Sequence, residues 1–391
     1  PEPGPRDMRI LDSKVRFVGD RVAFVAAETL EIAEQALGLI KVEYEELPCL
    51  FNVEAAMTSD IIIHSNPDKT GLHDATHNVA AHLDAEIGDV DKTLESSEFV
   101  FEGTYSTPFV QMASIEPHIS LTWLDENNRL VIRTSTQVPF HVRRIVAEVL
   151  DIPVGRIRVI KPRLGGGFGG KQEILNEELV AAVTLKTGKP ARIEYTRAEE
   201  LFAARLRHPE LVTFRLGFDK DQILTAIDLN ILENCGAYGP HALTVMSVTA
   251  QKALSMYKAA SIRVNGDGVY TNLPIGGAYR GYGAPQAFFP LESLMDEAAE
   301  TMGIDPIELR LKNVFKVGDD IPIAKILGEG REGFPMVLYS TEIEACLKEG
   351  RKLSDWERLR SEPGSGRYRR GIGVAVAGQG SGIPGIDMGA A

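Results

Sequence analysis

The sequence predicts an α+β fold, and three observations carry that prediction. The chain has 391 residues, which is long enough for two or three domains with a substantial core. Apolar residues recur with the two-residue period of strands in some segments and with the period of helices in others. Two glycine-rich runs, 164–172 and 276–286, each lie between a strand pattern and a helix pattern. Glycine lets other groups approach the main chain closely, so both runs are candidate binding loops.

The elements are expected in a definite order along the chain. Residues 14–56 carry the pattern strand, strand, helix, strand, and residues 59–97, rich in Asp, Ser, Thr and His, are expected to form an extended connector. Strands are expected at 100–105, 120–124, 130–135, 156–160, 213–218, 225–233, 268–272 and 371–377. Helices are expected at 141–150, 172–179, 285–302, from Asp305-Pro306 onward, and from Ser340 or Thr341 to about residue 348.

The first glycine run, Leu-Gly-Gly-Gly-Phe-Gly-Gly-Lys-Gln at 164–172, is expected to bind an anionic group. Its glycines permit positive φ, and the free N–H groups of the helix expected next favour negative charge. The run also matches two nucleotide-binding patterns. The P-loop pattern fails because Gln172 stands where a Ser or Thr hydroxyl must bind magnesium. The dinucleotide pattern would use Glu194 as the ribose-binding acid, but the strand before the run alternates charged and apolar residues, unlike a central parallel strand.

The second glycine run holds a single permanent charge. Arg280 lies between Tyr279 and Tyr282, and Gly281 and Gly283 free the backbone around it. Its planar guanidinium offers a rigid fork of hydrogen-bond donors. Neither nucleotide pattern explains this motif.

Together with Ser135-Thr136-Gln137, the two runs resemble the molybdenum hydroxylases, the xanthine dehydrogenase and aldehyde oxidase family, in the N-terminal half of their molybdopterin-binding large subunit. Softer matches follow in the same order along essentially the whole chain, at residues 15–20, 207–209 and 305–310. The resemblance implies the C-terminal part of an α/β hammerhead domain at 1–58, the connector at 59–97, and the first part of a mixed α+β molybdopterin-binding domain at 98–391. It also implies a split subunit or an incomplete chain.

The resemblance assigns roles to residues that match the family motifs. Gln137 and Arg280 are the implied catalytic residues: Gln137 hydrogen-bonds an oxygen ligand of molybdenum, and Arg280 lies beside the metal's terminal ligand. Gly167, Phe168 and Gly169 are the implied loop residues beside the cofactor.

The same resemblance implies a substrate site for an aromatic ring. Phe168 and Tyr282 would stack on the two faces of the ring, and Gln172 would face it where animal xanthine oxidases have a glutamate. A second substrate-binding arginine of those enzymes would fall near Val248, which disfavours xanthine itself. Gly281, where the family's carbon monoxide dehydrogenases have a copper-binding cysteine, disfavours a molybdenum–copper site.

The implied activity is hydroxylation of a purine-like or nicotinate-like N-heteroaromatic compound, with water as the oxygen source. The implied cofactor is molybdopterin with molybdenum, as the cytosine dinucleotide. The remaining part of the molybdenum subunit would carry a catalytic glutamate, and separate iron–sulfur and FAD partners would receive the electrons in a dimer of heteromers. The alternatives are aldehyde oxidation, reductive dehydroxylation of an aromatic acyl-CoA, a nucleotide-binding dehydrogenase, and a non-catalytic assembly module.

Composition excludes several other classes. The net charge is −13 and no basic stripe is interleaved with aromatics, which excludes nucleic acid as the expected partner. No apolar run reaches the length of a membrane span. The three cysteines show no C-x-x-C spacing, so neither a disulfide framework nor an iron–sulfur cluster is expected, and a cytoplasmic location fits best.

Overall fold

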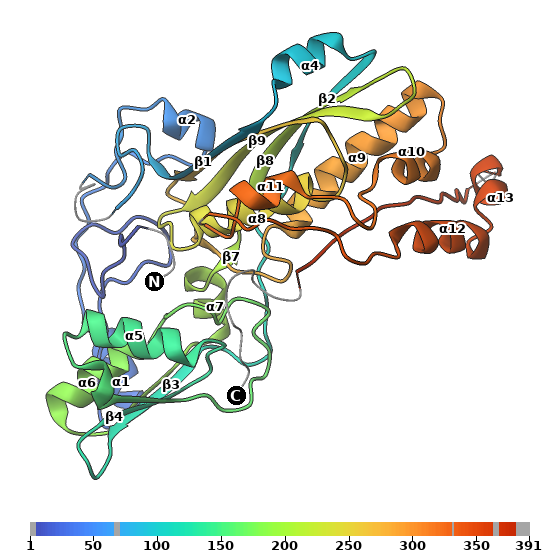
Figure 1. Cartoon of the computed structure of the whole chain (residues 1–391). Coiled ribbons are helices and arrows are strands. Elements are labelled where there is room, and N and C mark those ends of the chain that lie inside the picture. Colours follow the sequence, from blue (N-terminus) through green and yellow to red (C-terminus); the bar gives the residue numbers. More distant parts are fainter. Residues whose placement is uncertain (1–4, 66–70, 331, 363–366, 381–391) are drawn as a thin grey trace.

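The computed structural model describes residues 5–65, 71–330, 332–362 and 367–380 (Figure 1). The described residues form an α+β fold with mixed sheets, as predicted. No helix in these ranges combines the length and apolar composition that a membrane span requires.

The larger sheet has five strands and forms the upper part of the molecule in Figure 1. Strands β9 and β10 are parallel, and the other neighbouring pairs are antiparallel. In spatial order the strands are β1 (Val79–Ile87), β10 (Ser261–Tyr270), β9 (Leu224–Gly236), β8 (Glu210–Phe218) and β2 (Phe99–Ser106). The helices that pack on this sheet are α4 (Val90–Ser96), α8 (Ala242–Leu254) and α9 (Ala284–Met302).

The main hydrophobic core lies between this sheet and the helices α8 and α9. Phe214 and Leu229 from the sheet, Met246 from α8 and Leu291 from α9 are fully buried in it. Helix α9 follows the second glycine run directly and ends at Gly303, whose φ of 66° is the left-handed conformation common at helix C-termini. The core therefore holds the second glycine run at a fixed place.

The smaller sheet has four strands and lies below the larger one in Figure 1. Its strands, in spatial order, are β5 (Ile157–Ile160), β4 (Leu130–Thr134), β3 (Ile119–Leu124) and β6 (Ala191–Glu194). It packs with α5 (Pro139–Val149) and α6 (Glu177–Thr187) around a core that includes Ile132, Val146 and Ala181. The first glycine run leaves this sheet at the end of β5.

The remaining elements are short or peripheral. They are α1 (Leu30–Leu37), α2 (Val53–Met57), the 3-10 helix η1 (Val154–Arg156), α7 (Arg197–Ala203), β7 (Leu206–Arg207), β11 (Gly276–Gly277), α10 (Pro306–Asn313), α11 (Pro322–Ile326), α12 (Ile343–Leu353) and α13 (Trp356–Ser361). Strands β7 and β11 pair with each other in parallel. This short pairing brings the second glycine run beside the segment that precedes β8.

The expected elements differ from the structure in four regions of the chain. The helix in 14–56 forms as α1, but the strands expected beside it do not, and none of the α1 residues is buried. A strand needs a paired neighbour, and no strand within the described residues pairs with this segment. The strand expected at 371–377 is also absent. The extended connector is wrong for residues 79–96, which form β1 and α4 of the larger sheet. The helix expected at 172–179 begins only at Glu177.

Candidate functional site

The two glycine runs, far apart in sequence, lie against each other. The backbone N–H of Arg280 donates a hydrogen bond to the carbonyl oxygen of Phe168 over 2.8 Å. A Cβ added to Gly169 would lie 2.5 Å from the carbonyl oxygen of Ala278, so only glycine fits this contact. Gly169 also has a φ of 103°, which side-chain-bearing residues rarely adopt. The glycine at this point of the predicted binding loop thus allows the two runs to contact each other closely.

Gln137, which follows β4, joins the first run from the other side. Its side-chain Oε1 accepts hydrogen bonds from the backbone N–H groups of Gly169 (2.9 Å) and Lys171 (3.3 Å). A Cβ on Gly167 would lie 2.5 Å from this Oε1, so Gly167 leaves the room that the glutamine needs. The Nε2 of Gln137 has no partner within the described residues and is the end available to a ligand. The structure therefore brings together Gln137, Gly167, Phe168, Gly169 and Arg280.

Phe168 and Tyr282 both adopt a positive φ, of 52° and 44° respectively. Non-glycine residues in this region carry strain, which persists only where surrounding contacts fix it and is concentrated at functional sites. The Phe168 side chain is 48% exposed, which is unusual for a phenylalanine and suits a ring that a ligand covers. Tyr282 is half-buried.

Arg280 is exposed, and its guanidinium has no partner within the described residues. Its backbone is held by Arg207, whose Nη2 donates to the Arg280 carbonyl oxygen over 2.6 Å. The Arg207 guanidinium also lies 4.2 Å from the centre of the Tyr279 ring, a cation–π contact. Burial lowers the pKa of Arg207. The sequence placed Arg207 only in a softer family match, because a lone arginine shows no spacing that reveals such a role.

Lys171 has a structural role in this loop. Its ammonium group is buried and donates to the carbonyl oxygen and to Oε2 of Glu116, each over 2.9 Å. Glu116 Oε2 also accepts from the N–H of Gly165 over 2.7 Å. Burial would raise the pKa of Glu116, but the bonds from Lys171 and Gly165 outweigh it and lower that pKa. A lysine engaged in this way is not available to phosphates, which removes the P-loop alternative.

A carboxylate of the chain itself lies at the start of the following helix. Helix α6 begins at Glu177, and the Glu177 Oε2 accepts from the N–H groups of Leu175 (3.1 Å) and Asn176 (3.2 Å). Its own carboxylate therefore provides the negative charge there. Inside the glycine run, the N–H groups of Gly166, Gly167 and Phe168 have no acceptor in the described part of the chain.

Gln172 and Glu194 complete the predicted set. Gln172 is half-buried, its N–H donates to the Gly169 carbonyl oxygen over 3.0 Å, and its role toward a substrate stays a prediction. Glu194 is paired with Arg192 at the open edge strand β6 of the smaller sheet.

The available donors fit an oxygen-rich, anionic cofactor. Three sets of donors in one connected region lack partners among the described residues. They are the side-chain NH2 group of Gln137, the N–H groups of Gly166 to Phe168 and the Arg280 guanidinium. Polar groups so arranged suit the phosphate and oxo groups of a molybdopterin cofactor.

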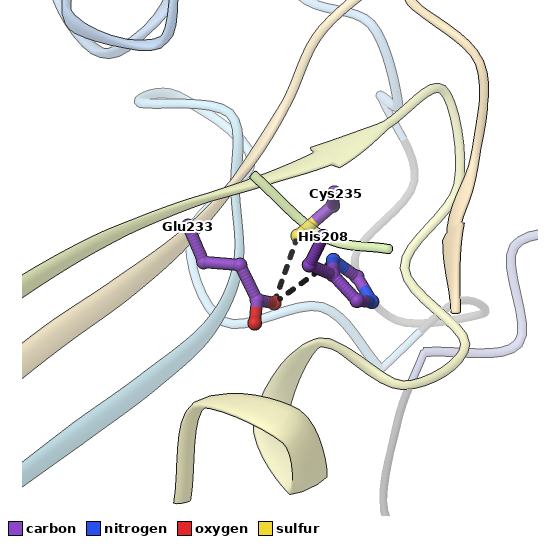
Figure 2. A group of neighbouring side chains, drawn as sticks. All are labelled: His208, Glu233 and Cys235. Atoms are coloured by element: carbon purple, nitrogen blue, oxygen red, sulfur yellow. Dashed lines mark hydrogen bonds and ion pairs between the residues drawn. The ribbon is translucent and has the colours of Figure 1, made fainter. Parts of the chain in front are cut away.

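A second group of polar side chains lies buried where β7, β8 and β9 meet (Figure 2). Ligand-type atoms of His208, Glu233 and Cys235 all lie within 4.8 Å of one another. His208 Nδ1, however, lies 3.2 Å from the Asn234 carbonyl oxygen and 3.3 Å from Glu233 Oε1. Both are acceptors, so Nδ1 carries a proton and has no lone pair for a metal. Burial lowers the pKa of His208 to about 3 and raises that of Cys235, so both are neutral.

The two buried carboxyl groups beside this cluster retain a proton. Glu210 on β8 lies directly opposite Glu233 on β9, and both are fully buried. Burial raises the pKa of Glu210 to about 8 and that of Glu233 well above its usual range, so the pair holds a proton at neutral pH. Thr249 donates to Glu210 over 2.8 Å. The cluster is therefore a hydrogen-bonded part of the core.

This pair predicts a pH dependence of stability. A free glutamate loses its proton near 4.5, but Glu210 in the folded chain keeps it to about pH 8. The unfolded chain thus binds fewer protons between these values, and stability falls as pH rises through them, by at most about 1.4 kcal/mol per pH unit for one proton. Glu210→Gln mimics the protonated acid and should show a flatter decline between pH 5 and 8 in urea unfolding. The exposed Glu95→Gln is the control, and an unchanged slope in Glu210→Gln would refute the retained proton.

Comparisons with known proteins identify the family. The model of the molybdopterin cofactor-binding domain matches residues 72–314, and that of the aldehyde oxidase and xanthine dehydrogenase a/b hammerhead domain matches residues 3–48. The chain is 37% identical over 373 residues to the xanthine dehydrogenase molybdenum-binding subunit of Escherichia coli O157:H7, covering 94% of this chain and 47% of that subunit.

Two further matches support the same family. The nicotinate dehydrogenase large molybdopterin subunit of Eubacterium barkeri is 34% identical over 319 residues, covering 81% of this chain and 73% of that protein. The crystal structure of the aldehyde oxidoreductase from Desulfovibrio desulfuricans superimposes with a TM-score of 0.79 at 28% identity, over 91% of this chain and 38% of that one. The chain therefore belongs to the xanthine dehydrogenase and aldehyde oxidase family of molybdenum hydroxylases and contains its molybdopterin cofactor-binding domain.

Proposed function

We propose that this chain forms part of an enzyme that hydroxylates an N-heteroaromatic substrate of the purine or pyridine type, with water as the oxygen source. The observation that carries the proposal is the junction of the two glycine runs, where Gln137, Phe168 and Arg280 meet. Relatives named for xanthine, a purine, and nicotinate, a pyridine, support this substrate class. Because the chain spans 47% of the xanthine dehydrogenase subunit, the activity belongs to a larger assembly.

Each site residue of this chain has a distinct proposed role. When bound, the molybdenum centre of the cofactor supplies two-electron oxidation and the activation of water. Gln137, held at Oε1 by the loop, would direct its Nε2 donors at an oxygen of the cofactor. The Arg280 guanidinium would hold positive charge where negative charge develops on the reacting group. The rings of Phe168 and Tyr282 would clamp a planar substrate, and the Gln172 amide would hydrogen-bond its polar edge.

The partners follow from the same assignment. We infer a cytosine dinucleotide form of molybdopterin, iron–sulfur and FAD subunits that accept the electrons, and a further portion of the molybdenum subunit, together in a dimer of heteromers. The exposed cysteines Cys49 and Cys346 are unpaired, which supports a reducing compartment such as the cytoplasm.

Isotope labelling tests the proposed reaction. The purified native complex, given hypoxanthine or nicotinate in ¹⁸O-labelled water with an artificial electron acceptor, should release a product with one labelled oxygen. Aldehydes and 4-hydroxybenzoyl-CoA with a reductant are the competing substrates. Turnover of either competitor at least tenfold faster than of both heteroaromatics, or an unlabelled product, would overturn the proposal.

A further inference from the structure

The hydroxyl group of Tyr282 is held by two side chains from the start of α8. Tyr282 Oη lies 2.6 Å from His241 Nδ1 and 2.7 Å from Thr244 Oγ1. Both partners are buried, with exposures of 1% for His241 and 3% for Thr244. The hydroxyl is therefore directed into the protein, and the ring is the part of Tyr282 that remains for contact with a ligand.

His241 in turn lies beside the residue that follows the first glycine run. Its Nε2 lies 3.3 Å from Oε1 of Glu173, the residue after Gln172, and the other oxygen of Glu173 is paired with the buried Arg205. The rings of His241 and Tyr282 are perpendicular, with centroids 5.7 Å apart. Glu173, His241 and Tyr282 thus form a second link between the two runs, in addition to the contact of Phe168 with Arg280.

The flexible backbone on either side of Tyr282 explains why its side chain needs this link. Gly281 and Gly283, on either side, have φ of 96° and 92°, and Tyr282 itself has a φ of 44°. Glycine is the most flexible residue, so a side chain between two glycines is not oriented by its backbone alone. The two bonds to the hydroxyl supply the orientation. A phenylalanine at this position would have the ring but no such bonds.

We propose that His241 and Glu173 are positioning residues that fix the ring of Tyr282 and thereby set the affinity of the site for planar ring substrates. This inference rests on the proposed function, because it takes Tyr282 to face the substrate. Thr244, the second partner of the Tyr282 hydroxyl, is part of the same arrangement.

A double-mutant cycle on the native complex tests the link. The Kd of hypoxanthine is measured by anaerobic calorimetry on the complex reduced beforehand with excess dithionite, so that no oxidised centre remains to turn the substrate over. Loss of one such hydrogen bond corresponds to about a three- to tenfold change in Kd. His241→Ala should raise the Kd by this factor, and Tyr282→Phe, which loses both bonds to the hydroxyl, should raise it by at least as much. The double variant should bind no more weakly than Tyr282→Phe alone. With an acceptor present, KM should rise while kcat changes less than twofold.

Thr244→Val, which preserves shape, is the second variant in case His241→Ala does not fold. It should weaken binding in the wild-type background and have no effect in Tyr282→Phe. The inference is overturned if the His241 or Thr244 substitution has the same effect in both backgrounds, or if Tyr282→Phe leaves the Kd unchanged. If the wild-type complex turns over heteroaromatics, those outcomes refute the positioning role alone; failure to bind hypoxanthine and nicotinate would overturn the proposed function with it.

Discussion

Arg280→Met should reduce turnover of the native complex by two or more orders of magnitude while the fold and the molybdenum content are retained. The Arg280 guanidinium is exposed and has no partner within the described residues, so the folded chain does not depend on it. In the proposed role it stabilises charge that develops only during the reaction, and removing one such donor typically costs about 10²- to 10³-fold in kcat. Steady-state kinetics and metal analysis on the same preparation measure both quantities.

Arg144→Met is the matched control for this prediction. Arg144 is also exposed, lies on α5 and forms no hydrogen bond or ion pair through its side chain within the described residues. Its substitution should leave kcat and KM unchanged. Near-normal turnover in Arg280→Met, or an equal loss in both variants, would contradict the assignment of Arg280.

Gly169→Ala should separate the two glycine runs and remove most of the molybdenum from the complex. The new methyl group would lie 2.5 Å from the Ala278 carbonyl oxygen, and the φ of 103° is unfavourable for alanine. To relieve this clash the backbone has to move, and the movement would break the hydrogen bonds of Gly169 to Gln137 and of Phe168 to Arg280. The expected loss is about 2–4 kcal/mol of unfolding free energy. Metal analysis and urea unfolding measure the two effects.

Gly155→Ala is the control for the glycine prediction. A Cβ at Gly155 has no atom within 4 Å, and its φ is not in the positive range. This variant should keep its molybdenum and its stability. A Gly169→Ala complex with full molybdenum content would show that the junction of the two runs does not hold the cofactor.

The glycine runs could be recognised from sequence because their chemistry is local. Five glycines around Phe168, and Arg280 between two tyrosines, are informative without knowledge of the fold. The resemblance also singled out Gln137, more than 25 residues before the first run, since the family motif carries long-range information. In the structure its side chain lies on the first run, and its role toward the cofactor stays a prediction.

The residues behind the site could not be found in this way. His241, Thr244 and Glu173 carry no motif. Only the packing of α8 against the second run brings His241 and Thr244 to Tyr282, and Glu173 reaches the group through His241. Glu210 and Glu233 become neighbours only through the register of β8 and β9, which single-sequence patterns do not fix.

The errors in the fold predicted from the sequence have related causes. Residues 41–44 alternate as a strand should, but pairing depends on a partner that a local pattern does not show. In contrast, β1 was missed because its segment is rich in polar residues, although Leu83 and Ala85 are buried at alternate positions, as expected of an antiparallel strand with one solvated face.

The most direct test of the central claim is to locate the metal. A crystal structure of the native complex, with anomalous diffraction measured at the molybdenum edge, gives the position of molybdenum relative to this chain. We predict one peak over the junction of residues 164–172 and 276–286, with a cofactor oxygen within hydrogen-bonding distance of the Gln137 amide and the Arg280 guanidinium beside it. A molybdenum peak remote from both side chains would contradict the account.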